Sequence, residues 1–527
     1  MADIGKNSED ASTKKRDPME IIEEALVLCK FGKFHLLLLF ASMTGVFAST
    51  TATTTSSYIL PSAECDLHMT IMQKGLLNAI PFVGQVGAAL FTGFLTDAFG
   101  RRIFLVSGYF GMFVCSILEG TSQSYLVLLL VKLIEGIFLS ISFSATSVMI
   151  SEYTHKNVRD RVMMCYAGFM SISLIVMALM SWAILPQPWD FVLLEDRFVF
   201  HSWNIYFFIC SIWSLLAGIS YYWLPESPKF LLSHGRENEA LEILQKIYSI
   251  NNGVPKESFP ILSLNSKGEY IPTVTHSFKK QIVNGLIEVK NLFRKPLLMR
   301  LILFCVMTFV CLLAYTALRL WYPQLSTIVE NYQKIHNETE QFCTMLNEYT
   351  TELARKVSQI NINVSEPQEC IPQVSGAETY INGIILGVVS LSCIATSGYL
   401  VAFFGQKPLM IVLLILSATC SGCLYWTYSS IQIAILVSAT CGFMQTALSL
   451  QQSILVRVFP TTLRGLTTSI ILMVGRSGSL LGNVLFPVFL EIGCMAPFLV
   501  LSVITLCVAG LVCFLPNPQK ENEAGDK

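Results

Sequence analysis

The segment GFLTDAFGRR, residues 93–102, joins two long apolar runs of the chain. A degraded copy, GYLVAFFGQK at residues 398–407, joins two further apolar runs, and its glycines, leucine and final basic residue match in one frame. Two charged positions seven residues apart repeat in the same frame: Glu152 and Arg159, then Arg457 and Arg464. Two motifs that repeat in one register predict that the chain consists of two related halves.

The chain contains twelve apolar runs that are long enough to cross a lipid bilayer. A spanning helix needs about 20 apolar residues because the hydrocarbon core is about 30 Å thick, and backbone polar groups in lipid must be paired within the helix. We predict helices at residues 34–57, 76–98, 103–121, 124–150, 162–185, 203–224, 299–321, 380–403, 409–427, 430–453, 466–490 and 495–515. The predicted fold is an all-α membrane protein with twelve transmembrane helices in two six-helix halves.

The amino-acid composition agrees with a lipid environment. Hydrophobic residues make up 53% of the chain and charged residues 13%, whereas soluble proteins carry about 25% charged residues. A net charge of −1 provides no general attraction for nucleic acids. Residues 1–33 are polar and of mixed charge, unlike a signal peptide, so we expect the first helix to act as an uncleaved insertion signal.

Lysine and arginine are concentrated on one side of the predicted membrane. With both termini inside, the cytoplasmic segments hold 27 of the 35 basic residues, as the positive-inside rule requires. The predicted segments are a cytoplasmic tail (1–33), the first six-helix half (34–224), a cytoplasmic central loop (225–298), the second half (299–515) with a long outer loop (322–379), and a cytoplasmic tail (516–527). Apolar residues at helical spacing predict an amphipathic helix at 238–249.

The long outer loop carries the features of an extracellular or lumenal segment. Sequons at Asn337 and Asn363 predict glycosylation there. Cys343 and Cys370 are expected to form a disulfide on this oxidising side. The alternatives are free thiols, or a different pairing with the other cysteines of the outer side, Cys65 and Cys494.

The segment 93–102 resembles the signature that major facilitator transporters carry between helices 2 and 3. Four further stretches are similar to the family of synaptic vesicle glycoprotein 2 and the SV2-related proteins, which neighbours the sugar and organic-ion porters: LPSAECDL at 60–67, FHSW at 200–203, LPESPKFLL at 224–232 and YTALRLWYP at 315–323. The resemblance covers essentially the whole membrane region. It implies secondary transport, in which two halves rock around a solute site near the membrane midplane.

The chain departs from the synaptic vesicle glycoproteins in its short polar N-terminus, its short outer loop and its first helix. The acidic pair of their first helix aligns with Ser49 and Ala52, so no acid lies between Phe34 and Ala63. This departure argues against cation coupling through helix 1. The hydroxyl-rich run 49–57 either satisfies itself on the helix backbone or contributes to polar recognition.

The resemblance assigns a cytoplasmic gate to the signature and its surroundings. Its residues are Gly93, Asp97, Gly100, Arg101, Arg102, Glu152, Arg159 and Arg464. The glycines permit close helix approach and a tight turn, and the adjacent arginines also anchor the topology. Asp97 is expected to meet the N-terminus of helix 11 and a basic partner, with Arg159 as the candidate, when this gate is shut. In the second half Ala402 and Gln406 replace the acid and the arginine, which predicts a weaker gate.

Ionisable residues within helices are costly in lipid and are therefore candidates for function. Lys132 and Glu135 share one helix face, where they form either a structural pair or a solute or proton site. Arg476 lies near the midplane of helix 11. Unless Glu135 or a backbone carbonyl pairs with it, Arg476 faces an aqueous cavity, which would favour anionic or polar solutes. Gln445 and Tyr315 complete the candidate substrate residues.

These observations predict a transporter rather than an enzyme. The sequence has no nucleophile–base or metal constellation, and it lacks the GxxxxGK[ST] loop of ATP-driven pumps. Cys420 and Cys423 lie in an apolar run, which indicates packing, so no metal or cofactor is predicted. We predict a monomeric multi-pass protein of the plasma membrane or a vesicle membrane, which transports a small organic solute, with or without a coupling ion. The alternative is a non-transporting trafficking or receptor-like membrane glycoprotein of the same fold.

The predicted orientation places Asn337 and Asn363 outside and the central loop inside. We expect the protein from cells to lose mass on treatment with an N-glycosidase, and the variants N337Q and N363Q each to lack one glycan. Protease added to intact cells should leave the segment 225–298 uncut. Cleavage within that segment would show that the orientation is inverted.

Overall fold

The computed structural model describes residues 18–194, 198–264, 292–295, 297–336, 340–349, 351, 375–459 and 464–515. Each of the twelve predicted apolar runs is a helix. The helices of the first half are α2 (Lys33–Ile59), α3 (Ile71–Phe99), α4 (Arg101–Gly120), α5 (Tyr125–Tyr153), α6 (Lys156–Ile184) and α7 (Ser202–Trp223). Those of the second half are α11 (Leu297–His336), α13 (Ala377–Phe404), α14 (Gln406–Cys423), α15 (Ser430–Val458), α16 (Arg464–Ile492) and α17 (Met495–Val512).

Eleven helices of the described part are long and apolar enough to cross a membrane. The helix α3 is not among them, and its apolar run is interrupted by Lys74, Asn78 and Gln85. These three side chains are buried inside the protein, so they face other helices and not lipid. The all-α fold with twelve helices in two groups is confirmed.

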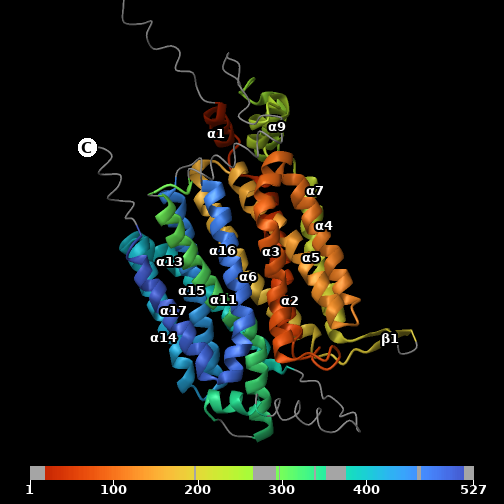
Figure 1. The fold of residues 1–527 in the computed structure, drawn as a ribbon. Helices are drawn as coiled ribbons and strands as arrows, with labels where there is room; N and C mark the ends of the chain where they lie inside the picture. Colours follow the sequence, from red (N-terminus) through yellow and green to blue (C-terminus); the bar gives the residue numbers. More distant parts are fainter. Residues whose placement is uncertain are drawn as a thin grey trace, which may run out of the picture.

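The two groups of helices stand side by side (Figure 1). One end of the bundle carries α1 (Pro18–Leu28), α8 (Pro228–Ser233) and α9 (Glu237–Asn252), and we call it the α1 end. The other end carries the antiparallel hairpin of β1 (Phe191–Leu194) and β2 (Phe198–Phe200), and we call it the hairpin end. Two short 3-10 turns complete the described elements: η1 (Lys256–Ser258) and η2 (Leu424–Trp426).

The duplication predicted from the repeated motif is visible in the backbone. Gly100 ends α3 with φ of +104°, and its counterpart Gly405 ends α13 with φ of +78°. Only glycine adopts such angles without strain, so each half makes the same sharp turn at the same point. Both turns lead directly into the next helix, α4 or α14.

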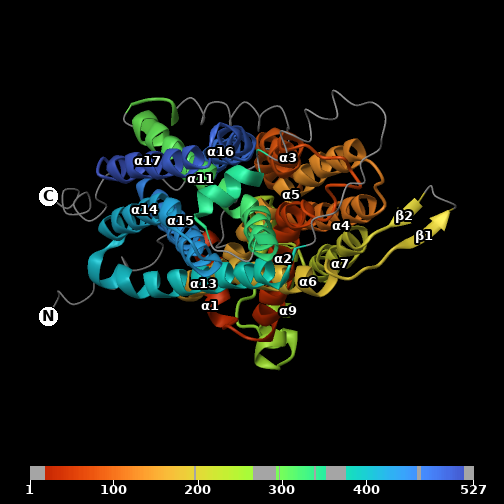
Figure 2. The same ribbon diagram turned by 90° about the horizontal axis from the view of Figure 1, so that it is seen from below.

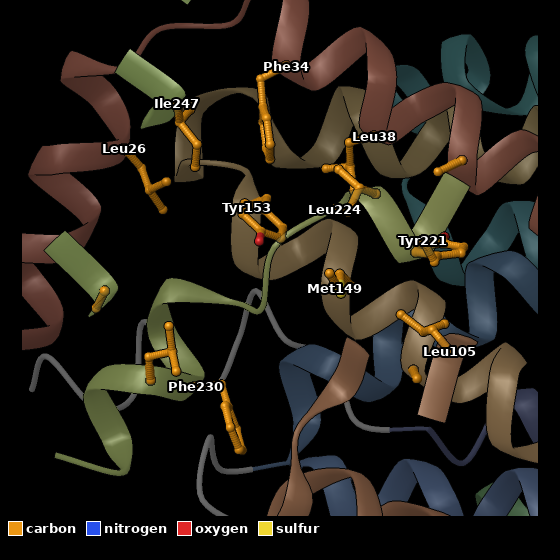
Figure 3. Packing of buried hydrophobic residues seen from close by; sticks show 14 of the residues in the cluster. Leu26, Phe34, Leu38, Leu105, Met149, Tyr153, Tyr221, Leu224, Phe230 and Ile247 are labelled. Atoms are coloured by element: carbon orange, nitrogen blue, oxygen red, sulfur yellow. The ribbon is translucent and has the colours of Figure 1, made fainter. Parts of the chain in front are cut away.

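An apolar cluster at the α1 end ties the segments outside the bundle to the first half (Figure 3). It joins side chains of α1, α2, α4, α5, α7, α8 and α9, and of the residue that follows α7: Leu26, Phe34, Leu38, Leu105, Met149, Tyr153, Tyr221, Leu224, Phe230 and Ile247. The predicted amphipathic helix is therefore confirmed as α9, which buries Leu244 and Ile247 completely. Both α1 and α9 are docked on the bundle by their apolar faces.

The predicted end of the seventh helix at residue 321 is wrong, because α11 continues to His336. Trp321, Tyr322 and Leu325 are buried in a second apolar cluster, which also contains Phe342 and Leu346. The one acid of this extension, Glu330, is buried and accepts a hydrogen bond from Lys334. The polar residues that suggested a loop thus belong to a helix that projects beyond the bundle and packs against the following segment.

The predicted disulfide between Cys343 and Cys370 is also wrong, because Cys343 is bonded to Cys494. The segment that starts at residue 341 packs on the hairpin end of the second half, where Phe342 N donates to Thr427 O at 2.9 Å and its ring lies 5.5 Å from that of Phe498. This packing brings Cys343 to the turn between α16 and α17. Cys65 is disulfide-bonded as well, and Cys370, Asn337 and Asn363 lie outside the described residues.

The Cys343–Cys494 disulfide closes a loop of 151 residues. We expect the double variant C343S/C494S to lower the free energy of unfolding by about 3–5 kcal/mol, since the cross-link restricts the unfolded chain. Thermal unfolding in detergent measures the loss, and C423S, which removes an exposed free thiol, is the matched control. A double variant as stable as C423S would contradict the assignment.

Candidate functional site

The two halves meet along two long helix pairs, α3 with α16 and α6 with α13, while α2 contacts α11 between them (Figure 2). At the hairpin end the contacts are close. A Cβ atom at Gly75 would lie 2.8 Å from Pro487 Cγ, and one at Gly383 would lie 2.4 Å from the Tyr58 hydroxyl. The Tyr58 ring also stacks on that of Tyr380, across the two halves. The boundary between the halves is therefore tightly packed at the hairpin end.

A buried ion pair lies beside this closed boundary. Lys74 Nζ lies 2.7 Å from Glu64 Oε2, and the lysine side chain is only 1% exposed. The adjoining cavity, lined by Lys74, Trp321, Gln324 and Tyr349 among others, has a volume of about 10 Å³. That volume holds one water at most, so the boundary beside Lys74 is filled by side chains.

Two arginines lie at the boundary between the halves, deeper in the bundle. Arg476 of α16 donates from Nη1 to Ser140 Oγ of α5 at 2.9 Å. Arg319 of α11 donates from Nη1 to Thr54 Oγ1 of α2 at 3.1 Å. The side chains of both arginines are partly buried. Among the described residues no carboxylate lies within ion-pair distance of either guanidinium.

A polar group of the second half adjoins Arg319. The guanidinium lies 5.6 Å from the centre of the Tyr315 ring, and the Tyr315 hydroxyl donates to Gln445 Oε1 at 3.5 Å. Tyr315, Gln445 and Arg476 are among the residues that the sequence predicts to contact the solute, whereas no role was predicted for Arg319. The signal for Arg319 was the same as for Arg476, a cation within an apolar run. A guanidinium has five N–H donors, and one contact with a hydroxyl leaves most of them for a carboxylate or phosphate.

A second set of charges is sealed within the first half. Lys132 Nζ lies 2.7 Å from Glu135 Oε2 and 2.9 Å from Glu119 Oε2, and it donates to Thr55 Oγ1 at 3.1 Å. The predicted pair of Lys132 and Glu135 is confirmed. Glu135 is therefore bound to Lys132 and not to Arg476, so the predicted alternative of a pair between Glu135 and Arg476 is wrong. Sequence analysis missed Glu119, although an acid within a predicted spanning helix signals function by the same rule.

The hydroxyls of α2 bind the backbone of their own helix, as predicted for one alternative, and they also bind basic side chains of the protein. Ser49 and Thr51 donate to carbonyls of their own helix, Gly45 O at 2.8 Å and Ala48 O at 2.7 Å. Thr54 and Thr55 accept hydrogen bonds from Arg319 and Lys132. One turn of α2 thus lies between the boundary arginine and the sealed cluster.

At the α1 end Glu226, of the LPESP stretch, binds the start of α4. Its carboxylate accepts the N–H groups of Arg101 at 3.2 Å, Arg102 at 3.1 Å and Ser227 at 3.0 Å. Arg101 also pairs with Glu152, at 2.9 Å. The predicted gate residues Arg101, Arg102 and Glu152 therefore lie in one network, and sequence analysis did not foresee the role of Glu226.

Arg159, the candidate partner of Asp97, forms an ion pair with Glu23 of α1 at 2.7 Å. The same carboxylate binds Lys229 of α8. Burial raises the pKa of Glu23, but the hydrogen bonds from Lys229 and Arg159 outweigh it and hold the pKa below its usual value. These bonds thus fasten α1 at neutral pH and weaken as the pH falls through that lowered pKa. The side chains of Asp97 and Arg464 lie outside the described part.

Three comparisons place this geometry among known proteins. The model of the family "Sugar (and other) transporter" matches residues 31–331, and that of the "Major Facilitator Superfamily" matches residues 341–527. Synaptic vesicle glycoprotein 2B of Rattus norvegicus is 25% identical over 314 residues, which are 56% of this chain and 46% of that protein. Synaptic vesicle glycoprotein 2C of the same species is 24% identical over 402 residues, 72% of this chain and 52% of that protein. The chain spans about half the length of these curated relatives.

Solved structures of sugar transporters share the fold. The xylose transporter XylE from E. coli, in a partially occluded inward-open conformation, superposes with a TM-score of 0.63 at 14% identity, covering 92% of this chain and 98% of that one. A D-xylose-proton symporter has a TM-score of 0.61, with 14% identity and the same coverage. At this identity the likeness shows the fold alone. Among the described residues, no group of His, Cys, Asp and Glu has the arrangement of a metal site.

Glu226 provides a test of the network at the α1 end. We expect E226A to destabilise the protein by about 1–2 kcal/mol, because three backbone N–H groups lose a charged acceptor. The readout is thermal unfolding in detergent. The variant E20Q, which changes an exposed acid of α1, should unfold like the parent protein. If E226A matches E20Q, the network does not hold the start of α4.

Proposed function

Because the chain belongs to the sugar (and other) transporter family of the major facilitator superfamily, we propose that it is a secondary transporter whose solute is a small organic anion. The observation that carries this proposal is the pair of arginines at the boundary between the halves. Arg319 and Arg476 each hold a hydroxyl of the opposite half, and neither has a carboxylate partner among the described residues.

An unpaired charge in a membrane interior raises the free energy of the folded protein. Insertion scales assign about 2.5–3.5 kcal/mol to an arginine at the centre of a spanning helix. In the interior ion pairs of this protein a carboxylate offsets such a cost, as Glu64 does for Lys74. A solute with a carboxylate or phosphate group would do the same for Arg319 and Arg476. A neutral sugar would leave both guanidinium charges uncompensated.

The contacts across the boundary suggest how binding drives the cycle. The hydrogen bonds Arg476–Ser140 and Arg319–Thr54 join the halves, so rocking of one half against the other breaks them. An anion that binds either arginine would replace the bond of that arginine to the opposite half and so weaken the contact between the halves. We place the α1 end on the cytoplasmic side of a plasma or vesicle membrane, and Asp97 in the gate of that end.

The second candidate is that the protein does not transport a solute but acts in membrane trafficking or as a receptor. The loss of charged residues from the gate motif of the second half favours this candidate. Gln406, at the position equivalent to Arg101, donates to Ser453 Oγ at 2.8 Å, a neutral contact where the first half has the ion pair Arg101–Glu152. A gate with one charged half still biases a rocking equilibrium, since charge at a helix terminus contributes about 0.3–1 kcal/mol. We therefore favour transport.

Uptake into proteoliposomes tests the proposal with matched pairs of solutes. Glucuronate is compared with glucose, xylonate with xylose, and succinate with succinamide. We expect the acid of at least one pair to accumulate and its neutral partner to stay outside. Both R476A and R319A should reduce that uptake at least tenfold, which corresponds to about 1.4 kcal/mol of lost binding. The control R236A removes an exposed arginine of the α1 end.

The outcomes separate the candidates. Neutral partners accumulating as well as the acids would contradict an anionic solute, and full uptake by R476A would remove its role. Uptake of no solute would favour the non-transporting protein. Since Glu135 is bound to Lys132, adding E135A to R476A should restore neither uptake nor stability.

A further inference from the structure

Three ionisable side chains form a cluster that the solute site does not use. Glu119 lies near the end of α4, and Lys132 and Glu135 lie one helix turn apart on α5. Both carboxyl groups contact the same ammonium group, at 2.9 Å and 2.7 Å, and none of the three side chains is more than 2% exposed. We call these three residues the α4–α5 cluster.

The α4–α5 cluster contains two carboxyl groups and one ammonium group, and its surroundings supply no second positive charge among the described residues. Besides the two carboxyl groups, Lys132 binds Ala52 O and Thr55 Oγ1 of α2, and the Phe207 ring of α7 lies 5.1 Å from its nitrogen. Ser116 of α4 donates to Glu135 Oε1 at 3.1 Å. The other titratable groups that face the cluster are the thiols of Cys115 on α4 and Cys210 on α7. If both carboxyl groups are ionised, the cluster carries a net charge of −1 in a site closed to water.

One oxygen of the cluster lacks a partner. Glu119 Oε1 is buried and has no hydrogen-bond donor among the described residues, whereas the oxygens of Glu135 are bound by Ser116 and Lys132. An unpartnered carboxylate oxygen in an apolar interior is costly, and two carboxylates at one site do not both remain ionised. The missing ligand is therefore positive and small enough to enter a filled site.

We propose that the α4–α5 cluster binds one proton, with Glu119 as its principal acceptor. The step is the transfer of a proton from a hydronium ion to one carboxylate oxygen of Glu119: an O–H bond of the hydronium ion breaks, a water molecule leaves, and the new O–H bond gives a neutral carboxyl group. The cluster then consists of one neutral acid and the ion pair Lys132–Glu135, with no net charge. A bound metal ion is disfavoured because Lys132 already occupies the position between the two carboxyl groups.

The position of the cluster links proton binding to the boundary between the halves. Lys132 binds Thr55, and the preceding residue Thr54 binds Arg319 of the second half. A change of one charge in the cluster therefore acts within one turn of α2 on a contact that must break in the transport cycle. If the proposed function holds, the proton is the coupling ion, and its entry with a monovalent anion transfers no net charge.

Infrared difference spectroscopy of the purified full chain tests proton binding without any solute. We expect a carboxyl C=O stretching band of a buried acid at neutral pH, which shifts in D₂O and disappears in E119Q. Glutamine mimics the protonated acid in shape and charge, so E119Q should fold and melt like the parent. The matched control is E330Q, which changes another buried acid that is already paired with a lysine. Absence of the band in the parent protein, or its persistence in E119Q, overturns the proposal.

Uptake experiments then separate this inference from the proposed function. With the acids of the uptake panel, an outside-acid gradient should stimulate accumulation by the parent protein and by E330Q. E119Q should lose the stimulation but retain exchange of internal for external solute, since exchange needs no net proton movement. A band without uptake would leave the proton site standing and reject transport. Uptake without the band, and without stimulation by the gradient, would reject the proton site alone.

Discussion

A charge inside a lipid-embedded bundle is costly unless an opposite charge, hydrogen bonds or water stabilise it. The interior cations of this protein differ in which of these partners they have. Lys74 forms an ion pair with Glu64, and Lys132 forms ion pairs with Glu119 and Glu135. Arg319 and Arg476 bind hydroxyl groups and have no carboxylate partner among the described residues, and both lie where the two halves meet. Charge is therefore incompletely compensated at two places: the boundary between the halves, and the α4–α5 cluster, where Glu119 Oε1 has no donor among the described residues.

The two halves pack tightly at the hairpin end, around Gly75 and Gly383. Deeper in the bundle, a hydrogen bond joins each boundary arginine to the opposite half. At the α1 end, the described contacts include those of Glu226 with α4 and of Glu23 with Arg159 and Lys229. The segments α1, α8 and α9 are thus fastened to the first half.

The twelve helices were predictable because a bilayer demands apolar runs of a fixed length, and the run itself carries the signal. The positions of interior charges were equally visible, including Arg476 and Lys132. Of their partners, Glu135 was predictable because it shares a helix face with Lys132. Partners on other helices were not, because they depend on how each helix is rotated and which helices are adjacent. Ser140 for Arg476, Glu119 for Lys132 and Glu226 for the start of α4 are all contacts of this kind. The Cys343–Cys494 bond and the length of α11 depend on packing beyond the membrane, where no periodic pattern reports it.

Movement of one half against the other is the central claim, and distances between spin labels measure it directly. One pair of labels replaces the exposed residues Ile103 and Phe403 at the α1 end, and another replaces Leu126 and Ile431 at the hairpin end. The exposed native thiols Cys165, Cys423, Cys507 and Cys513 are removed first. Changing the pH and adding the acids of the uptake panel should lengthen one distance while the other shortens. Distances that stay single and unchanged at both ends under every condition would contradict the account.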